Sequence, residues 1–206
     1  MITIIDYGVG NLFSLQSSVS AVGEKAEVVS DPASLSAAEK LILPGVGAFG
    51  DAMEKLSSSG MAEALLEEAK KGKPVLGICL GMQLLFEKSL EFGEHPGLGL
   101  LKGEVRPIRE VIDPALKIPH IGWNGLHFVR RDPLFRDVRE GDAVYFVHSF
   151  HAVGCEDSLL ATTEYSAPLT AAAAKDNIYG CQFHPEKSGR IGLSILKRFC
   201  ESGVGR

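Results

Sequence analysis

The residues best suited to chemistry in this 206-residue chain are one cysteine and, more than a hundred positions later, a histidine and a glutamate. Cys79 stands in the stretch GICLG at 77–81, where an apolar run gives way to a helical pattern. Glycines two positions to either side permit the sharp strand-to-helix turn of a nucleophile elbow, because a Cβ there would collide with the turn. A helix that begins just after Cys79 directs its positive end at the sulfur and favours the thiolate. The pentapeptide therefore predicts a nucleophilic thiol.

A base and its orienting group are offered by the stretch QFHPE at 182–186. A cysteine nucleophile needs a base within hydrogen-bond reach, and His184 can take the thiol proton. Glu186 can hold the imidazole in the correct tautomer. The proline between them fixes the backbone from which both side chains depart. The pattern predicts a triad of Cys79, His184 and Glu186.

A third stretch, LPGVGAF at 43–49, follows another short apolar run. Two glycines in such a turn leave backbone N–H groups free to face a developing negative charge. We therefore expect an oxyanion hole at Gly45 and Val46, completed by the backbone N–H of Leu80.

The elements that must position these residues alternate between short apolar runs and amphipathic segments through the first half of the chain. This alternation is typical of parallel strands joined by helices. Strands are predicted at 2–6, 27–30, 41–43, 74–78 and 178–183. Helices are predicted from Asn11, which can act as the cap, at 51–71, after Cys79 and at 189–200.

The second half of the chain differs, because β-branched and aromatic stretches between 103 and 175 are separated by turn signals. This pattern predicts antiparallel or mixed strands that extend the sheet. The predicted fold class is α/β, a flavodoxin-like or Rossmann-like open sheet with a parallel centre flanked by helices. Residues 1–206 are predicted to form a single domain.

Composition narrows the function classes. A formal net charge of −5 and a pI near 5.7 argue against a nucleic-acid-binding surface. The first residues carry no basic segment, and the apolar runs are too short to span a membrane, so we expect a cytoplasmic protein. None of the four cysteines forms a CxxC pair, so neither a metal site nor a cofactor is predicted.

Taken together, the motifs GICLGMQ at 77–83, PGVGAF at 44–49 and FHPEKS at 183–188 resemble the class I, triad-type glutamine amidotransferases. Three further stretches resemble one group within that family, the glutaminase subunits of imidazole glycerol phosphate synthase. They are IDYGVGNLFSL near the start, IPHIGWN at 118–124 and FVHSF at 146–150. The resemblance extends from Ile2 to Phe199.

The resemblance implies a substrate and a partner. Cys79 would attack the side-chain amide of L-glutamine, Gln83 and Glu91 would bind that substrate, and the released ammonia would pass to a (β/α)8-barrel cyclase subunit in a heterodimer. The family pattern adds substrate contacts from the backbone around His148, Ser149 and Phe150. It places an interface with the cyclase at Asn11, Pro119, His120, Trp123 and Lys187. One departure is Phe150, where the family often has tyrosine, which removes any hydrogen bond from that hydroxyl.

Other interpretations of the same residues stay open at this point. An amidotransferase subunit for anthranilate, aminodeoxychorismate or pyridoxal phosphate synthesis would share the triad motifs. A cysteine peptidase or hydrolase would share the elbow, although Gln83 and Glu91 speak against it. A binding module without catalysis would require the cysteine, histidine and glutamate to coincide by chance.

Overall fold

The computed structural model describes residues 1–201, and its centre is an eight-stranded sheet with the order β2-β1-β3-β4-β14-β13-β12-β9. The first five of these strands run parallel. They are β2 (Ala26–Val29), β1 (Ile2–Ile5), β3 (Lys40–Leu43), β4 (Val75–Ile78) and β14 (Ile178–Cys181). The other three, β13 (Pro168–Lys175), β12 (Leu159–Glu164) and β9 (His127–Phe128), extend the sheet in antiparallel pairing. The predicted α/β fold with a parallel centre is confirmed.

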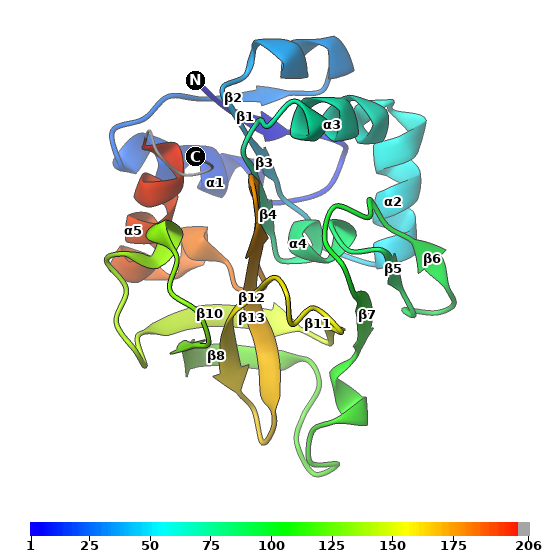
Figure 1. Cartoon of the computed structure of the whole chain (residues 1–206), viewed down its shortest axis with the longest axis vertical. Helices are drawn as coiled ribbons and strands as arrows, with labels where there is room; N and C mark the ends of the chain where they lie inside the picture. Colours follow the sequence, from blue (N-terminus) through cyan, green and yellow to red (C-terminus); the bar gives the residue numbers. More distant parts are fainter. Residues whose placement is uncertain (202–206) are drawn as a thin grey trace.

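Helices cover both faces of the parallel part of the sheet (Figure 1). On one side lie α1 (Leu12–Ala21) and α5 (Gly189–Cys200), which contact each other. On the other side lie α2 (Phe49–Ser58), α3 (Met61–Lys70) and the short α4 (Leu80–Leu84). Each side has its own apolar cluster, and strands β1, β3 and β4 are buried along their whole length because both faces are covered. The carboxyl ends of the parallel strands therefore meet at one edge, where ligands bind in folds of this type.

Two details of the helices differ from the sequence-based expectation. The helix predicted over 51–71 is two helices, because Gly60 adopts a left-handed conformation with φ 76° between α2 and α3. The helix after Cys79 ends at Leu84, sooner than its apolar pattern suggests. Asn11 is the predicted cap of α1, and its Oδ1 accepts a hydrogen bond from Ser14 N at 3.3 Å.

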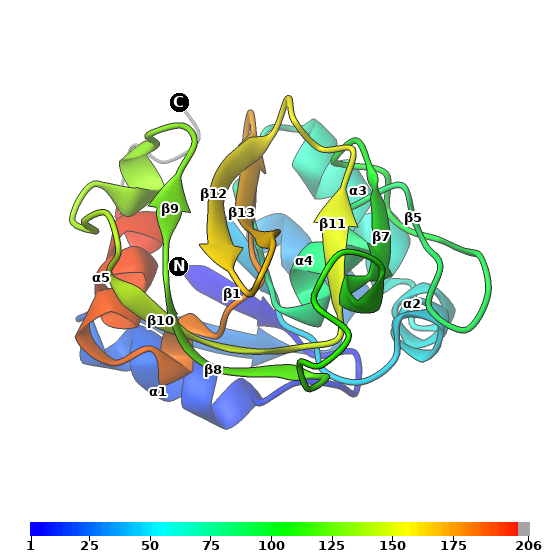
Figure 2. The ribbon, with the colours of Figure 1, turned by 90° about the horizontal axis from the view of Figure 1, so that it is seen from below.

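Two smaller sheets surround the carboxyl edge of the parallel strands (Figure 2). One pairs β8 (His120–Gly125) with β10 (Ala143–His148). The other contains β5 (Lys88–Ser89), β6 (His95–Pro96), β7 (Glu104–Pro107) and β11 (Phe150–Val153). The part of the chain that the structure describes also contains the 3₁₀ turns η1 (Pro32–Ala37), η2 (Ile108–Glu110), η3 (Pro133–Phe135) and η4 (Pro185–Lys187).

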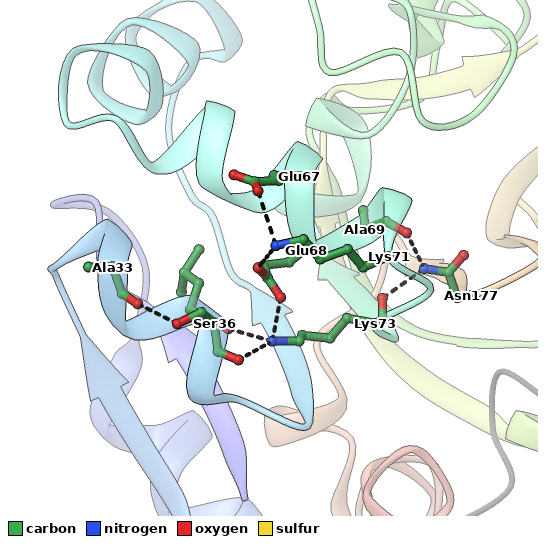
Figure 3. A network of polar contacts seen from close by, with 9 residues as sticks. Ala33, Ser36, Glu67, Glu68, Ala69, Lys71, Lys73 and Asn177 are labelled. Carbon is green, nitrogen blue, oxygen red and sulfur yellow. Dashed lines mark hydrogen bonds and ion pairs between the residues drawn. The ribbon is translucent and has the colours of Figure 1, made fainter.

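At the opposite, amino edge of β4 and β14, a polar network joins η1, α3 and both strands (Figure 3). Glu68 bonds Lys71 at 2.8 Å and Lys73 at 2.6 Å, and the Lys73 ammonium also donates to the carbonyls of Leu35 and Ser36. Asn177 donates to the carbonyls of Ala69 and Lys73 and so ties the start of β14 to the end of α3. Within residues 1–201, no helix has the length and apolar character needed to cross a membrane.

Candidate active site

The turn between β4 and α4 holds Cys79 in a strained backbone conformation. Its φ of 55° and ψ of −113° are rare for a residue with a side chain, and such strain is typical of functional sites. The flanking glycines are required by close packing: a Cβ at Gly77 would lie 2.6 Å from Gly81 O, and one at Gly81 would lie 1.9 Å from Leu43 O. The local sequence therefore builds a sharp elbow that presents the sulfur beyond the sheet.

The imidazole of His184 is held from behind by Glu186. His184 Nδ1 and Glu186 Oε1 are 2.8 Å apart, and both side chains are buried, with 4% and 5% exposed. The other ring nitrogen, Nε2, makes no hydrogen bond of normal geometry with residues 1–201 and is left for the sulfur. Burial alone would lower the pKa of His184, but the Cys79 sulfur and the Glu186 carboxylate outweigh burial and raise that pKa to about 9. An imidazolium beside the sulfur stabilises a thiolate.

The turn expected to form the oxyanion hole packs directly against the elbow. A Cβ at Gly45 would lie 2.8 Å from Gly81 N and 2.9 Å from the Tyr7 hydroxyl. That hydroxyl donates to Pro44 O at 2.8 Å and so fixes the first peptide of the turn. Within residues 1–201, the backbone N–H groups of Val46 and Leu80 donate to no other group. These two N–H groups therefore have no acceptor within the described residues.

One cavity of about 280 Å³ brings together most of the residues singled out from the sequence. Cys79 and His184 line it together with two residues of the PGVG turn and with Gln83 and Glu91. The end of β10 and the start of β11 also line it. The predicted site residues that line it are Val46, Cys79, Leu80, Gln83, Glu91, Pro119, His148, Ser149, Phe150 and His184. A cavity of this size accommodates a small amino acid.

The polar groups of this cavity are suited to such a ligand. Glu91 Oε2 accepts a hydrogen bond from Phe49 N at 2.7 Å, while burial raises the pKa of the Glu91 carboxyl. A cation beside it would therefore favour its ionised form. Gln83 is buried and uses its Nε2 on Phe150 O and on Gln182 Oε1, which leaves its Oε1 to face a ligand.

Of the five residues expected at a partner interface, all but His120 are exposed. Asn11 and Lys187 are exposed, and so is Pro119, which lines the cavity mouth. Trp123 is 56% exposed. The ring of Tyr145 lies 5.9 Å from that of Trp123 and 6.0 Å from Lys187 Nζ.

His120 is the exception, because its side chain is 1% exposed. It stacks on Phe146 and Tyr165 and bonds His148 and Asn124. The His120 side chain therefore does not reach the surface in this conformation, and its contact with a partner stays a prediction. The physical reason is the alternation of β8, which turns His120 inward and Ile121 and Trp123 outward.

The sequence-based reasoning did not single out Tyr7 or Gln182. Tyr7 follows β1 and anchors the PGVG turn. Gln182 follows β14, is fully buried, and its Nε2 lies 3.9 Å from the Cys79 sulfur. A signal for Gln182 existed, since residues two positions apart on an extended segment face the same side and His184 is two positions further on.

The other three cysteines, all free and buried, differ from Cys79 in their surroundings. Burial raises the pKa of the Cys155 thiol, raises that of Cys181 further, and raises that of Cys200 to about 12. Their thiols therefore stay protonated and unreactive at neutral pH. Within residues 1–201, no group of three or more histidine, cysteine, aspartate or glutamate side chains is arranged to hold a metal ion.

Comparison with known proteins agrees with this geometry. The family model "Glutamine amidotransferase class-I" matches residues 3–202. The chain is 53% identical over 205 residues to the imidazole glycerol phosphate synthase subunit HisH of Wolinella succinogenes, with 98% of this chain and 100% of that one covered. It is 50% identical over 202 residues to the subunit of the same name from Caldanaerobacter subterraneus, with 98% of each chain covered.

Solved structures show the same fold at low sequence identity. A glutamine amidotransferase crystal structure superposes with a TM-score of 0.75 at 16% identity and covers 97% of this chain and 99% of that one. The PurLQS structure from Thermotoga maritima gives a TM-score of 0.72 at 21% identity, with 96% of each chain covered. Together with the family match and the full-length relatives, these findings show that the chain belongs to the class-I glutamine amidotransferases, in the group of the HisH subunits of imidazole glycerol phosphate synthase.

Proposed function

We propose that this chain hydrolyses L-glutamine at Cys79 and delivers the ammonia to a (β/α)8-barrel cyclase subunit of imidazole glycerol phosphate synthase. In that heterodimer the cyclase would make imidazole glycerol phosphate and AICAR from PRFAR in histidine biosynthesis, in the cytoplasm. One observation carries the proposal: Cys79 and His184 share one cavity with Gln83 and Glu91, whose polar groups suit an amino acid. The whole chain is proposed to act as a single amidotransferase domain.

The chemistry is acyl transfer to the sulfur. The Cys79 thiolate attacks the side-chain carbonyl carbon of glutamine, and the N–H groups of Val46 and Leu80 stabilise the oxyanion. His184 is protonated at neutral pH and gives its proton to the departing ammonia. The same imidazole then accepts a proton from the water that hydrolyses the γ-glutamyl thioester. Removing one oxyanion donor typically costs on the order of 10²-fold in rate.

The substrate is proposed to lie with its α-amino group at Glu91. An ammonium there would offset the cost of burying the carboxylate. The backbone around His148, Ser149 and Phe150, which also lines the cavity, would receive the α-carboxylate. Gln83 would contact the substrate through its Oε1.

The partner is proposed to dock over the cavity mouth. Ile121 and Trp123 are 57% and 56% exposed on the outer face of β8, and Val46 is 45% exposed in the PGVG turn. Because Gly47 has a φ of 98° and lies within this exposed turn, the turn can change conformation at low cost. We propose that docking of the cyclase with its nucleotide bound sets this turn and completes the oxyanion hole, so that the free subunit stays idle.

Ammonia release from glutamine, measured with and without the cyclase and its nucleotide substrate, tests this function. We expect release to be fast in the complete mixture and slow in the free subunit. Cys79→Ala should abolish it, while the matched variant Cys155→Ala, which removes a buried thiol away from the cavity, should retain it. Rapid hydrolysis by the Cys79→Ala variant would contradict the assignment, and equal turnover with and without the cyclase would contradict the activation step.

A further inference from the structure

Gln182 is a buried polar residue in direct contact with the nucleophile. It is 0% exposed, it follows β14, and its Nε2 donates toward the Cys79 sulfur at 3.9 Å. It does not belong to the lining of the cavity proposed to bind glutamine. Its position therefore suits an effect on the sulfur more than an effect on substrate binding.

The orientation of the Gln182 amide follows from its neighbours. The Phe150 carbonyl can only accept, so Gln83 must present Nε2 to it, at 3.2 Å. The second hydrogen on Gln83 Nε2 then goes to Gln182 Oε1 at 2.9 Å. With Oε1 used in this way, Gln182 can present only N–H groups to the sulfur of Cys79. If the oxygen and nitrogen of either side-chain amide changed places, two acceptors or two donors would face each other.

The Phe150 carbonyl, with which this series of hydrogen bonds begins, has a second donor. His148 Nδ1 lies 2.8 Å from Phe150 O, and its Nε2 lies 3.0 Å from His120 Nδ1. Burial lowers the pKa of His148 to about 3, so its ring stays neutral. A neutral ring can donate through Nδ1 to the Phe150 carbonyl, so this carbonyl has two donors, His148 and Gln83.

Several groups influence the charge of the Cys79 sulfur. The Val147 carbonyl lies 3.9 Å away and can accept only from the thiol form. The titratable groups that interact with the sulfur are Tyr7 after β1, Cys181 in β14 and His184, with Glu186 behind that histidine. Of these, only a protonated His184 favours the thiolate. A second donor to the sulfur would oppose the effect of the Val147 carbonyl.

We propose that Gln182 is a further catalytic residue, whose amide, locked by Gln83 and the Phe150 carbonyl, donates to the Cys79 sulfur and stabilises the thiolate. The proposal rests on the proposed role of Cys79 as the nucleophile. A hydrogen bond to a charged group is among the stronger ones in proteins, and the 3.9 Å length places this one at the weak end of that class.

The pH dependence of Cys79 alkylation by iodoacetamide, followed by mass spectrometry of the cysteine's peptide in the full chain, tests the proposal. Gln182→Met keeps the length of the side chain but removes the donor, so we expect the alkylation midpoint to rise by about 1 pH unit. Gln182→Glu keeps the acceptor for Gln83 but places a carboxylate at the sulfur, so we expect a larger rise. In the complex with the cyclase, kcat for glutamine should fall about tenfold with KM within about twofold.

The control is Thr170→Val, which removes another buried hydrogen bond, 2.7 Å long, to Ala152 O and away from the sulfur. Thr170→Val should lower stability without moving the pH midpoint of Cys79 alkylation. It therefore separates a general loss of stability from a specific effect on the sulfur. If the midpoints of both Gln182 variants equal that of the wild-type chain, this inference is wrong even though Cys79 remains essential. If Cys79→Ala retains glutamine hydrolysis, the proposed function fails instead, whatever the Gln182 variants show.

Discussion

The two ends of the same pair of strands, β4 and β14, are built in opposite ways. At their amino ends, Glu68, Lys73 and Asn177 form a network in which the carboxylate, the ammonium and the amide group all have partners. At their carboxyl ends, the backbone of Cys79 is strained, and His184 Nε2 and Glu186 Oε2 are buried without a hydrogen bond to residues 1–201. The comparison separates a region that ties elements together from one that is prepared for a ligand.

The free-energy cost of the local structure therefore differs between the two ends. A buried polar atom without a partner costs about 1–3 kcal/mol, and a side chain held at positive φ costs about as much again. At the amino ends, Glu68 has a pKa lowered by its hydrogen bonds to Lys71 and Lys73, which shows that the folded state favours its charge. The protein thus has energetically unfavourable features at the carboxyl edge of the parallel strands, where folds of this type bind ligands. The opposite, amino edge is stabilised by its polar network.

The largest effect is expected at Cys79, and two substitutions separate activity from strain. Both Cys79→Ala and Cys79→Gly remove the sulfur, so each should lower glutamine hydrolysis by on the order of 10⁴-fold or more. Their stabilities should differ, because glycine adopts a φ of 55° without strain and alanine does not. Denaturant unfolding should show the glycine variant more stable by about 1 kcal/mol, the reverse of the usual order. An alanine variant of equal or higher stability would show that the elbow is not strained.

A smaller effect, on stability alone, is expected at the amino ends. Lys73→Met removes the ammonium that joins Glu68 to the carbonyls of Leu35 and Ser36, so the free energy of unfolding should fall by about 1–3 kcal/mol. Glutamine hydrolysis in the assembled complex should stay unchanged. The control is Lys70→Met, an exposed lysine of α3, which should change stability by less than about 0.5 kcal/mol. If the folded Lys73→Met variant lost glutamine hydrolysis, the amino ends would also contribute to activity. The distinction drawn between the two ends would then be wrong.

Much of this arrangement could be predicted from the sequence because it depends on local patterns. The buried strands β1, β3 and β4 are mostly apolar, and Asn11 is a side chain suited to a cap. The glycines of GICLG predict a tight turn, and in the structure Gly77 and Gly81 pack so closely that neither has room for a Cβ. The cavity brings Cys79 and His184 together because β4 and β14 are neighbours, as a parallel sheet allows.

The rest depends on contacts between distant parts of the chain. Helix α4 ends early because the carbonyls of Leu84 and Leu85 bond to Leu98 and Leu100, and no local signal shows this. His120 faces inward because β8 pairs with β10 in a register that the stretch IPHIGWN does not reveal. The hydrogen bonds that run from Gln83 through Gln182 to the Cys79 sulfur join residues about a hundred positions apart in the sequence.

The central claim, that the sulfur of Cys79 carries the acyl group of glutamine, is tested most directly by trapping the intermediate. The assembled complex would be mixed with glutamine, quenched in acid within one turnover, and digested for mass spectrometry. We expect a γ-glutamyl group on the peptide that contains Cys79, and none on the peptides that contain Cys155, Cys181 or Cys200. Release of ammonia with no such adduct at any quench time, or an adduct on another residue, would contradict the account.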